Sequence, residues 1–366
     1  MTNPNYKPLV VDTFDKLAEE DIDYVKPVVD GFLPGIGAFL FCGSSKLGKS
    51  WLALLLGLKV CKGEPFWGYD VKKTSVLYLC LEDGRRRLQD RMFRVAEEYP
   101  QNFYFTTEAM TIDTNLIKQL EEQMKEHPDI GLIIIDSLAA IRGEQSTANG
   151  NMFYDDYHII RILHEFTQQH NITILLIHHV RKNQSADPFE DISGSNGLHA
   201  ASDGAFVMRR EDSGVKLYHR HRDMAEQVYT IEFDHADCVW KLLDVGTPEE
   251  DAFKTDHDLK CVMKYLEDHD EYEGLAQDFC DLIGARKKAQ SLSGKLSNRK
   301  YQLEKMGIIF EKTKTNKGMV FRFSRVKEEN AEKKTEDSPW DIPEGMTADD
   351  FPIEIFGDEE EVSDDV

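Results

Sequence analysis

The chain has 366 residues, a formal net charge of −23 and a hydrophobic content of 41%. This length suffices for two or three domains with a sizeable core. No run of 18 apolar residues predicts a membrane span, and the first seven residues lack the apolar segment of a secretion signal. The six cysteines show no C-x-x-C spacing, which argues against zinc sites and disulfide frameworks. We therefore expect a cytoplasmic protein with no membrane partner.

The charge is distributed unevenly along the chain. Residues 286–325 carry 12 Lys and Arg against 2 Glu, a net charge of +10. Residues 326–366 carry 16 Asp and Glu against 3 Lys, a net charge of −13. The sequence thus predicts an acidic body, a basic block and an acidic tail, joined in one chain.

The elements expected in chain order begin with a charged lead segment, residues 1–30, with a short helix over 14–23. Residues 31–245 then alternate apolar runs with helical patterns, which is typical of an α/β fold with a mainly parallel sheet. The expected strands are 38–42, 75–81, 103–106, 132–135, 173–177 and 204–208, followed by an antiparallel pair at 215–221 and 228–233. The expected helices are 49–62, 84–98, 116–127 and 153–170.

A linker is expected over residues 246–256, which combine Gly246, Pro248 and several acids. Residues 257–325 predict three helices and a hairpin with its turn at Asn316-Lys317-Gly318. The expected helices are 258–268, 274–283 and 289–305, and the hairpin strands are 307–312 and 319–323. This arrangement resembles a winged helix–turn–helix domain. Residues 326–366 are rich in Asp, Glu and Pro, and we interpret them as a disordered acidic tail.

A phosphate-binding loop is the strongest motif. Residues 43–50 read Gly-Ser-Ser-Lys-Leu-Gly-Lys-Ser and match G-x-x-x-x-G-K-S/T between an expected strand and an expected helix. Gly43 and Gly48 let the backbone turn its N–H groups toward an anion at the helix N-terminus. Lys49 can reach the β- and γ-phosphates, and the Ser50 hydroxyl can bind Mg²⁺. The expected nucleotide-binding residues are Gly43, Ser44, Ser45, Lys46, Leu47, Gly48, Lys49, Ser50 and Trp51.

Acidic residues end two of the expected strands. Asp136 follows four apolar residues in the Walker B pattern, and we expect it to hold Mg²⁺ together with Ser50. Glu82 ends the strand after the phosphate-loop helix and can polarise an attacking water molecule. The alternative for Glu82 is a helix-capping role, which we assign instead to Asp83 as a solvated cap.

Two further pairs of residues carry functional hypotheses. His178 and His179 end another expected strand, where one of them can sense the γ-phosphate; the alternative is a core histidine with satisfied hydrogen bonds. Because adjacent strand residues point to opposite faces, the two cannot easily share a metal. Arg220 and Arg222 lie on one face of a strand and can complete a neighbouring subunit's site, or they form a solvated edge.

This set of residues resembles the RecA/DnaB-type ATPase core, and most nearly the RepA-like ATPases of plasmids and other mobile elements, over residues 31–240. Lys46, the strand end at Glu82-Asp83, the run from His178 to Lys182 and Gly194-Ser195 carry the RepA-like resemblance. The resemblance implies ATP and Mg²⁺ as cofactors, Glu82 as the catalytic carboxylate, a histidine sensor and Arg222, beside Arg220, as a finger acting in trans. Replicative helicases of this class commonly carry Gln and Lys-x-Arg where this chain has His and Arg-x-Arg.

The resemblance also implies a homo-hexamer with single-stranded DNA in its channel, faced by loops at 142–151 and 181–195. These loops hold few cations, so we expect the basic block to contact duplex or forked DNA. Solvated lysines or a protein-binding module are the alternatives. The tail suits docking to a replication protein or acts as a solubilising segment. The expected function is an ATP-dependent DNA motor in replication of a mobile element. A RecA-paralog regulator or loader, and an ATP-switched DNA-binding repressor or partition-like protein, are alternatives.

Overall fold

The computed structural model describes residues 9, 11–22, 24–142, 152–181, 184–192 and 196–325. The chain divides into two compact units, Met1–Asp251 and Ala252–Val366. The acidic tail, most of the loop at 142–151 and parts of the loop at 181–195 fall outside the described residues, and so do Lys182 and Gly194-Ser195. No described helix is long and apolar enough to cross a membrane.

The first unit is built on one sheet, which has nine strands in the described residues, in the order β3-β2-β4-β5-β1-β6-β7-β8-β9. The first six of these run parallel, and β7, β8 and β9 extend the sheet as antiparallel strands. The strands are β1 (Gly37–Gly43), β2 (Ser75–Cys80), β3 (Phe103–Thr106), β4 (Ile130–Asp136), β5 (Thr173–His179), β6 (Gly204–Glu211), β7 (Gly214–His221), β8 (Gln227–Asp234) and β9 (Val239–Gly246).

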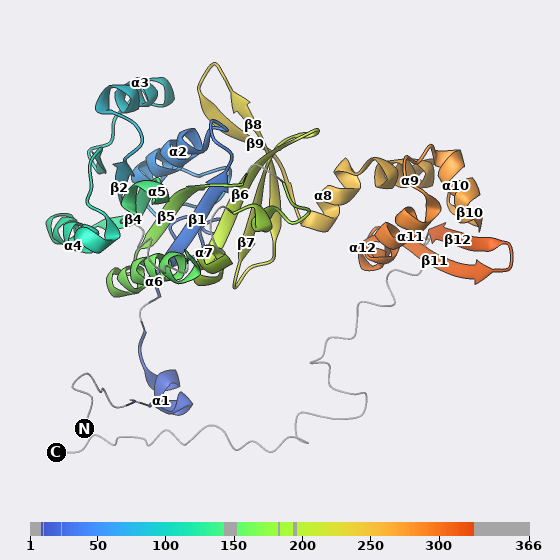
Figure 1. Cartoon of the computed structure of the whole chain (residues 1–366), viewed down its shortest axis with the longest axis horizontal. Helices are drawn as coiled ribbons and strands as arrows, with labels where there is room; N and C mark the ends of the chain where they lie inside the picture. The colour runs from blue at the N-terminus through green and yellow to red at the C-terminus, as the bar shows by residue number, and fades with distance from the viewer. Residues whose placement is uncertain are drawn as a thin grey trace, which may run out of the picture. The chain divides into compact units, whose positions relative to one another are not determined.

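Helices cover both faces of the sheet (Figure 1). α2 and α3 pack on one face with alternate strand residues such as Phe39 and Tyr78. α4, α5, α6 and α7 pack on the other face, where Leu40 and Leu79 point. The helices of this unit are α1 (Phe14–Glu19), α2 (Lys49–Lys62), α3 (Arg85–Val95), α4 (Leu116–Glu126), α5 (Leu138–Ile141), α6 (Met152–His170) and α7 (Asn196–Ala201), with short 3₁₀ turns at Ile112–Thr114 and Pro188–Asp191.

Burial on both faces explains the apolar runs of the central strands. Every residue of β1 and of β2 is buried, because each strand has a helical layer above and below it. The α/β class with a mainly parallel sheet is thereby confirmed, and the phosphate loop joins β1 to α2 as expected.

The region after β8 differs from the sequence prediction. β9 is an additional strand, held by Trp240, whose side chain is buried in the core of the first unit. The expected linker at 246–256 is not irregular, since Pro248–Thr255 forms helix α8. Pro248 and the three acids after it are compatible with a linker. Proline and acidic residues are, however, also favourable in the first turn of a helix, which is where these residues lie.

The second unit combines helices with a three-stranded antiparallel sheet in the order β10-β12-β11. Its elements are α9 (His257–Asp268), β10 (Glu271–Leu275), α10 (Ala276–Ile283), α11 (Ala289–Ser297), α12 (Lys300–Lys305), β11 (Ile308–Thr315) and β12 (Gly318–Arg325). Leu259, Phe279, Leu292 and Phe321 are fully buried in its core. Two expectations differ from the structure. Gly274 and Leu275, expected to begin a helix, end strand β10, and the helix begins at Ala276; the helix expected over 289–305 is broken at Asn298 and Arg299.

Candidate nucleotide-binding site

The expected site residues meet at the carboxyl ends of the parallel strands. β1, β2, β4 and β5 are neighbours in the sheet, so their ends lie side by side. A pocket of about 380 Å³ opens there. It is lined by Ser45, Lys46, Gly48, Lys49, Ser50, Trp51, Glu82, Asp83, Arg87, Arg91, Asp136, Ile177 and His179.

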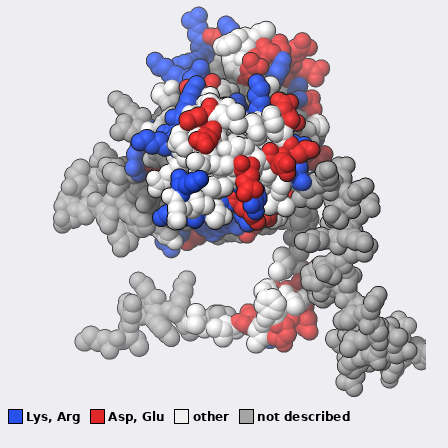
Figure 2. Space-filling view, turned by 90° about the vertical axis from the view of Figure 1, so that its right-hand side faces the viewer, with Lys and Arg blue, Asp and Glu red and all other residues white. Residues whose placement is uncertain are grey.

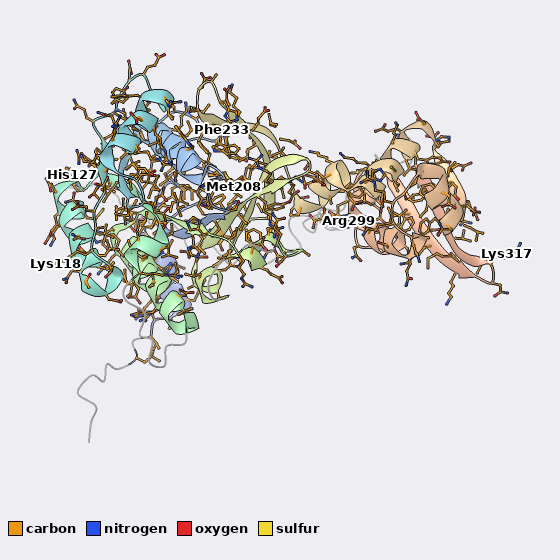
Figure 3. All side chains as sticks on the ribbon, turned by 45° about the horizontal axis from the view of Figure 1, so that its top comes forward. Lys118, His127, Met208, Phe233, Arg299 and Lys317 are labelled. Carbon is orange, nitrogen blue, oxygen red and sulfur yellow. The ribbon has the colours of Figure 1, made fainter. Side chains whose placement is uncertain are left out.

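Two glycines of the phosphate loop lie close to other parts of the first unit, and these contacts hold the loop in place. Gly48 has a φ of +99°, and a Cβ atom added to it would lie 2.9 Å from the Trp240 ring. The Trp240 Nε1 donates a hydrogen bond to the Gly48 carbonyl, 3.1 Å away. Gly43 lies against Met208 of β6, which Figure 3 labels within the first unit. Leu47 packs into the core and does not line the pocket.

Lys49 points back into its own loop. Its Nζ donates hydrogen bonds to the carbonyls of Gly43 at 2.7 Å and Ser44 at 2.9 Å. The side chain is buried, and this burial lowers the pKa of the Lys49 ammonium, while Asp136 and Glu82 oppose the shift. The Lys49 ammonium is thus held by the loop carbonyls. Phosphate oxygens of a bound nucleotide would compete with these carbonyls for its hydrogen bonds.

Asp136 and Ser50 form an oxygen-rich corner of the pocket. Asp136 is 4% exposed. It accepts a hydrogen bond from the Tyr78 hydroxyl at 3.0 Å and another from Ser50. Burial raises the pKa of Asp136, and the hydrogen bonds from Ser50 and Tyr78 oppose this shift.

The corner fits Mg²⁺, because carboxylate and hydroxyl oxygens are hard ligands and Mg²⁺ is usually bound by one or two protein groups, with water and phosphate oxygens. In the described part of the chain, no cluster of three or more His, Cys, Asp or Glu side chains could hold a metal by itself. Ser50 and Asp136 would therefore hold Mg²⁺ as part of a shared coordination sphere.

Glu82 lies across the pocket in contact with two polar side chains. The Ser137 hydroxyl donates a hydrogen bond to Glu82 Oε1. His179 Nε2 lies 3.8 Å from the same oxygen, and both side chains are partly exposed. The structure therefore places His179 in the pocket. His178, which is 4% exposed, does not line it.

Asp83 is not a solvated cap. Its side chain is only 9% exposed and forms ion pairs with Arg91 and with Arg87, the latter at 3.1 Å. Arg91 also lies over the Trp51 ring, 5.4 Å from its centroid. Arg87 and Arg91 were missed in the sequence, although their spacing of four and eight residues from Asp83 places them on one helical face.

Arg220 and Arg222 do not line this pocket of their own chain. In the β6–β7 register, Arg220 is opposite Ala205 and so lies toward the amino end of β6, whereas Gly43 is opposite Met208 nearer the other end. Arg220 is held by Asp187 at 3.0 Å and Glu226 at 2.5 Å. Arg222 is more exposed, with Asp203 Oδ1 at 3.8 Å.

The basic block is partly neutralised within the second unit. Lys295 forms ion pairs with Asp256 at 2.5 Å and Asp258 at 3.4 Å, and Arg322 is paired with Glu273 at 2.8 Å. On the face drawn in Figure 2, lysine and arginine side chains are accordingly interspersed with acidic ones. Lys317 lies at the tip of the β11–β12 hairpin and points outward, as Figure 3 shows.

Comparison with known proteins finds a family model and solved structures that are similar to this chain. A family model described as an AAA domain matches residues 4–185, just under half of the chain. No curated protein matches the sequence. Among solved structures, a DnaB-like replicative helicase, described with its primase interactions, matches at 14% identity and a TM-score of 0.49; the match covers 63% of this chain and 65% of that one. A KaiC-like protein of the archaeon Pyrococcus horikoshii matches at 14% identity and a TM-score of 0.41, covering 59% and 94%.

The match to the helicase thus spans less than two thirds of the helicase chain. The family match coincides with the phosphate loop, the Walker B strand and most of the parallel sheet. From this coincidence we conclude that the first unit is an α/β domain with a P-loop, and that its residues up to 185 are similar to an AAA domain.

Proposed function

We propose that the chain is a Mg²⁺-dependent ATPase of the RepA/DnaB-like type, acting on DNA in the cytosol. The observation that carries the proposal is the convergence of Lys49, Ser50, Glu82, Asp136 and His179 on one pocket. These side chains supply a phosphate-binding cation, hard oxygen ligands, a base and a neutral or cationic sensor.

Each side chain has a separate role in the proposed reaction. Lys49 neutralises phosphate charge, while Ser50 and Asp136 hold Mg²⁺, which when bound offsets the charge on the β- and γ-phosphates. Glu82 accepts a hydrogen bond from the attacking water, and the Ser137 hydroxyl orients the Glu82 carboxylate. His179 is close enough to Glu82 to respond to a change in charge at that carboxylate.

We further propose that the protein assembles head to tail, as a homo-hexamer. Arg220 and Arg222 lie toward the opposite strand ends from the phosphate loop, so a neighbouring copy would have to supply either one to this site. Because Arg220 is already held by Asp187 and Glu226, Arg222 is the better candidate for a finger acting in trans.

The second unit is the proposed contact with duplex or forked DNA, with a single strand passing through the ring. The element order from α9 through the β11–β12 hairpin supports a winged-helix interpretation. Lys312, Lys314 and Lys317 of the hairpin are exposed, and no described acidic residue forms an ion pair with any of them. The proposed role is that the protein couples ATP hydrolysis to translocation along DNA or to its unwinding, in replication of a mobile element.

The ATPase proposal is tested with Lys49→Ala, which should abolish ATP hydrolysis because the phosphate-binding cation is lost. Full activity in that variant would refute the site assignment. Assembly is tested by measuring the mass of the purified protein with ATP, Mg²⁺ and single-stranded DNA. A ring supports the finger and channel roles, and a persistent monomer contradicts both.

Forked DNA separates the proposal from its two alternatives. A motor should separate the strands in an ATP-dependent way. ATP turnover without strand separation would favour a regulator or loader of another replication protein. Loss of turnover in Glu82→Gln with undiminished replication would favour an ATP-switched repressor or partition-like protein.

A further inference from the structure

The edge strand of the main sheet is unpaired on its outer side. β3 is the last strand in the sheet order and pairs only with β2 among the described strands. An edge strand presents a row of free backbone N–H and C=O groups, to which another strand can be added. α3 and α4 lie at this same end of the sheet, as Figure 1 shows.

A cavity lies on each face of the sheet at this edge, and each has a volume of about 500 Å³. On the α4 side, the first cavity is lined by aliphatic residues of β2 and α4 such as Leu79 and Leu120. Its lining also includes polar side chains: Tyr104, Thr106, Glu108, Gln119, Glu122 and Gln123. On the α3 side, Leu88, Met92, Tyr99 and Arg85 help to line the second. Phe103 and Phe105 border both.

This geometry fits an added strand better than a compact ligand. Successive side chains of a strand point to opposite faces of its sheet. A strand paired with β3 would therefore place alternate side chains in the two cavities. One cavity is lined by aliphatic and polar residues, and the other by cationic and aromatic ones. Main-chain hydrogen bonds would supply affinity, and the cavities would select the side chains.

The cavity on the α3 side favours an acidic occupant. Arg85, Arg86 and Arg94 are exposed, and no described carboxylate forms an ion pair with any of them. Arg85 lies over the Phe105 ring, 5.0 Å from its centroid, and Phe105 is 41% exposed. Cationic groups beside exposed aromatic surface suit a peptide that alternates acidic and apolar residues.

The chain carries such a segment in its own tail. Residues 351–356 read Phe-Pro-Ile-Glu-Ile-Phe within the stretch of net charge −13. Ile353 and Ile355 fall on one side of an extended segment, and Glu354 falls on the other. The segment is separated from β12 by residues 326–350, which span at most about 85 Å when fully extended.

We propose that residues 351–356 of the tail, from the same or a second copy, bind as an added strand along β3. Ile353 and Ile355 occupy the cavity on the α4 side against Leu79 and Leu120, and Glu354 lies on the α3 side with Arg85 and Arg86, away from the glutamates of the first cavity. This inference does not depend on ATP hydrolysis or on DNA binding.

Hydrogen–deuterium exchange of the full-length protein tests the proposal without nucleotide. Those backbone amides of Phe103–Thr106 that face away from β2 should exchange at least about tenfold faster in Ile353→Asp/Ile355→Asp than in the wild type, because the added strand is lost. Val362→Asp/Val366→Asp, which adds the same two negative charges elsewhere in the tail, is the control and should leave their exchange unchanged. Equal exchange at β3 in all three proteins would overturn the proposal.

A labelled peptide of residues 349–358 provides an independent measurement. It is titrated by fluorescence anisotropy against full-length Ile353→Asp/Ile355→Asp, whose own segment no longer competes. Adding Arg85→Glu should weaken binding about tenfold, since an attraction becomes a repulsion. Adding Arg94→Glu, which makes the same charge change on the same helix but outside the cavity, should change binding by less than about twofold.

Strand addition is distinguished from simple groove binding with three peptides, each N-methylated at one residue: Ile353, Glu354 or Ile355. Main-chain pairing predicts that a methyl group on a nitrogen facing β3 abolishes binding, whereas the same group on the outward-facing side is tolerated. Because backbone N–H groups alternate in direction, methylation at Glu354 should have the opposite effect to methylation at Ile355. Binding that is indifferent to all three, or an oligothymidylate that binds in an Arg85-dependent way while the peptide does not, would overturn the proposal.

Discussion

His219 offers a sharp test of how the first unit is packed. It lies on β7 with 1% of its surface exposed, and its ring stacks on Phe206 at a centroid distance of 4.2 Å. Neither ring nitrogen has a hydrogen-bond partner among the described residues. Burial, with a smaller contribution from His221, lowers the pKa of His219 to about 3. We predict that His219→Phe keeps the stacking and removes the titration.

The sign of the effect follows from proton linkage. The unfolded chain binds a proton at His219 below a pH of about 6.5, whereas the folded chain does so only near pH 3. The stabilising contribution of the neutral ring is therefore present above pH 6.5 and is lost as the pH falls. The loss is about 1.4 kcal/mol per pH unit, or roughly 3 kcal/mol at pH 4.5.

Urea unfolding measures this contribution at pH 7.5 and pH 4.5. Tryptophan fluorescence reports mainly on the first unit, because Trp51, Trp67 and Trp240 belong to its core cluster. The variant should gain roughly 3 kcal/mol over the wild type at pH 4.5, beyond any difference seen at pH 7.5. An identical difference at the two pH values would refute the assignment of His219 as a neutral core residue.

Three further variants examine the nucleotide site. Glu82→Gln should lower the rate of ATP hydrolysis by about 10²–10⁴ while ATP affinity in filter binding stays nearly unchanged, and a matching loss of affinity would contradict the role of a base. Gly48→Ala should lower the free energy of unfolding in urea by about 1–3 kcal/mol, because of its φ of +99° and the contact with Trp240; a variant as stable as the wild type would show that the loop relaxes freely. Tyr78→Phe removes a hydrogen bond that lowers the pKa of Asp136, so the acid limb of the pH–rate profile should move to higher pH, and an unmoved limb would argue that Asp136 does not control that limb.

Much of the site could be located from local sequence. The phosphate loop is contiguous, and Glu82, Asp136 and the histidine pair each end an apolar run. Parallel strands bring such ends to one side of a sheet, so their proximity follows from the fold class. The sequence does not predict which of His178 and His179 lies in the pocket. Side-chain alternation places the two on opposite faces of the strand, but it does not say which face is beside the phosphate loop.

The supporting contacts required the folded chain. Trp240 and Gly48 are 192 residues apart, and Glu82 and Ser137 are 55 apart. Neither Trp240 nor Ser137 belongs to a motif, and no local pattern pairs either with its partner. Asp83 was interpreted as a solvated cap because its own sequence position favours one, whereas the two arginines of α3 hold its carboxylate against the pocket.

The sequence by itself determined the phosphate loop, the α/β class and the acidic strand ends, because these depend on neighbours in the chain and on the alternation of side chains along a strand. Only the tertiary structure decided the strand order, and with it the edge position of β3 among the described strands and the position of Arg222 outside the pocket. The physical reason is that strand order depends on which helices cover which face, and this packing is summed over the whole unit rather than over any one segment.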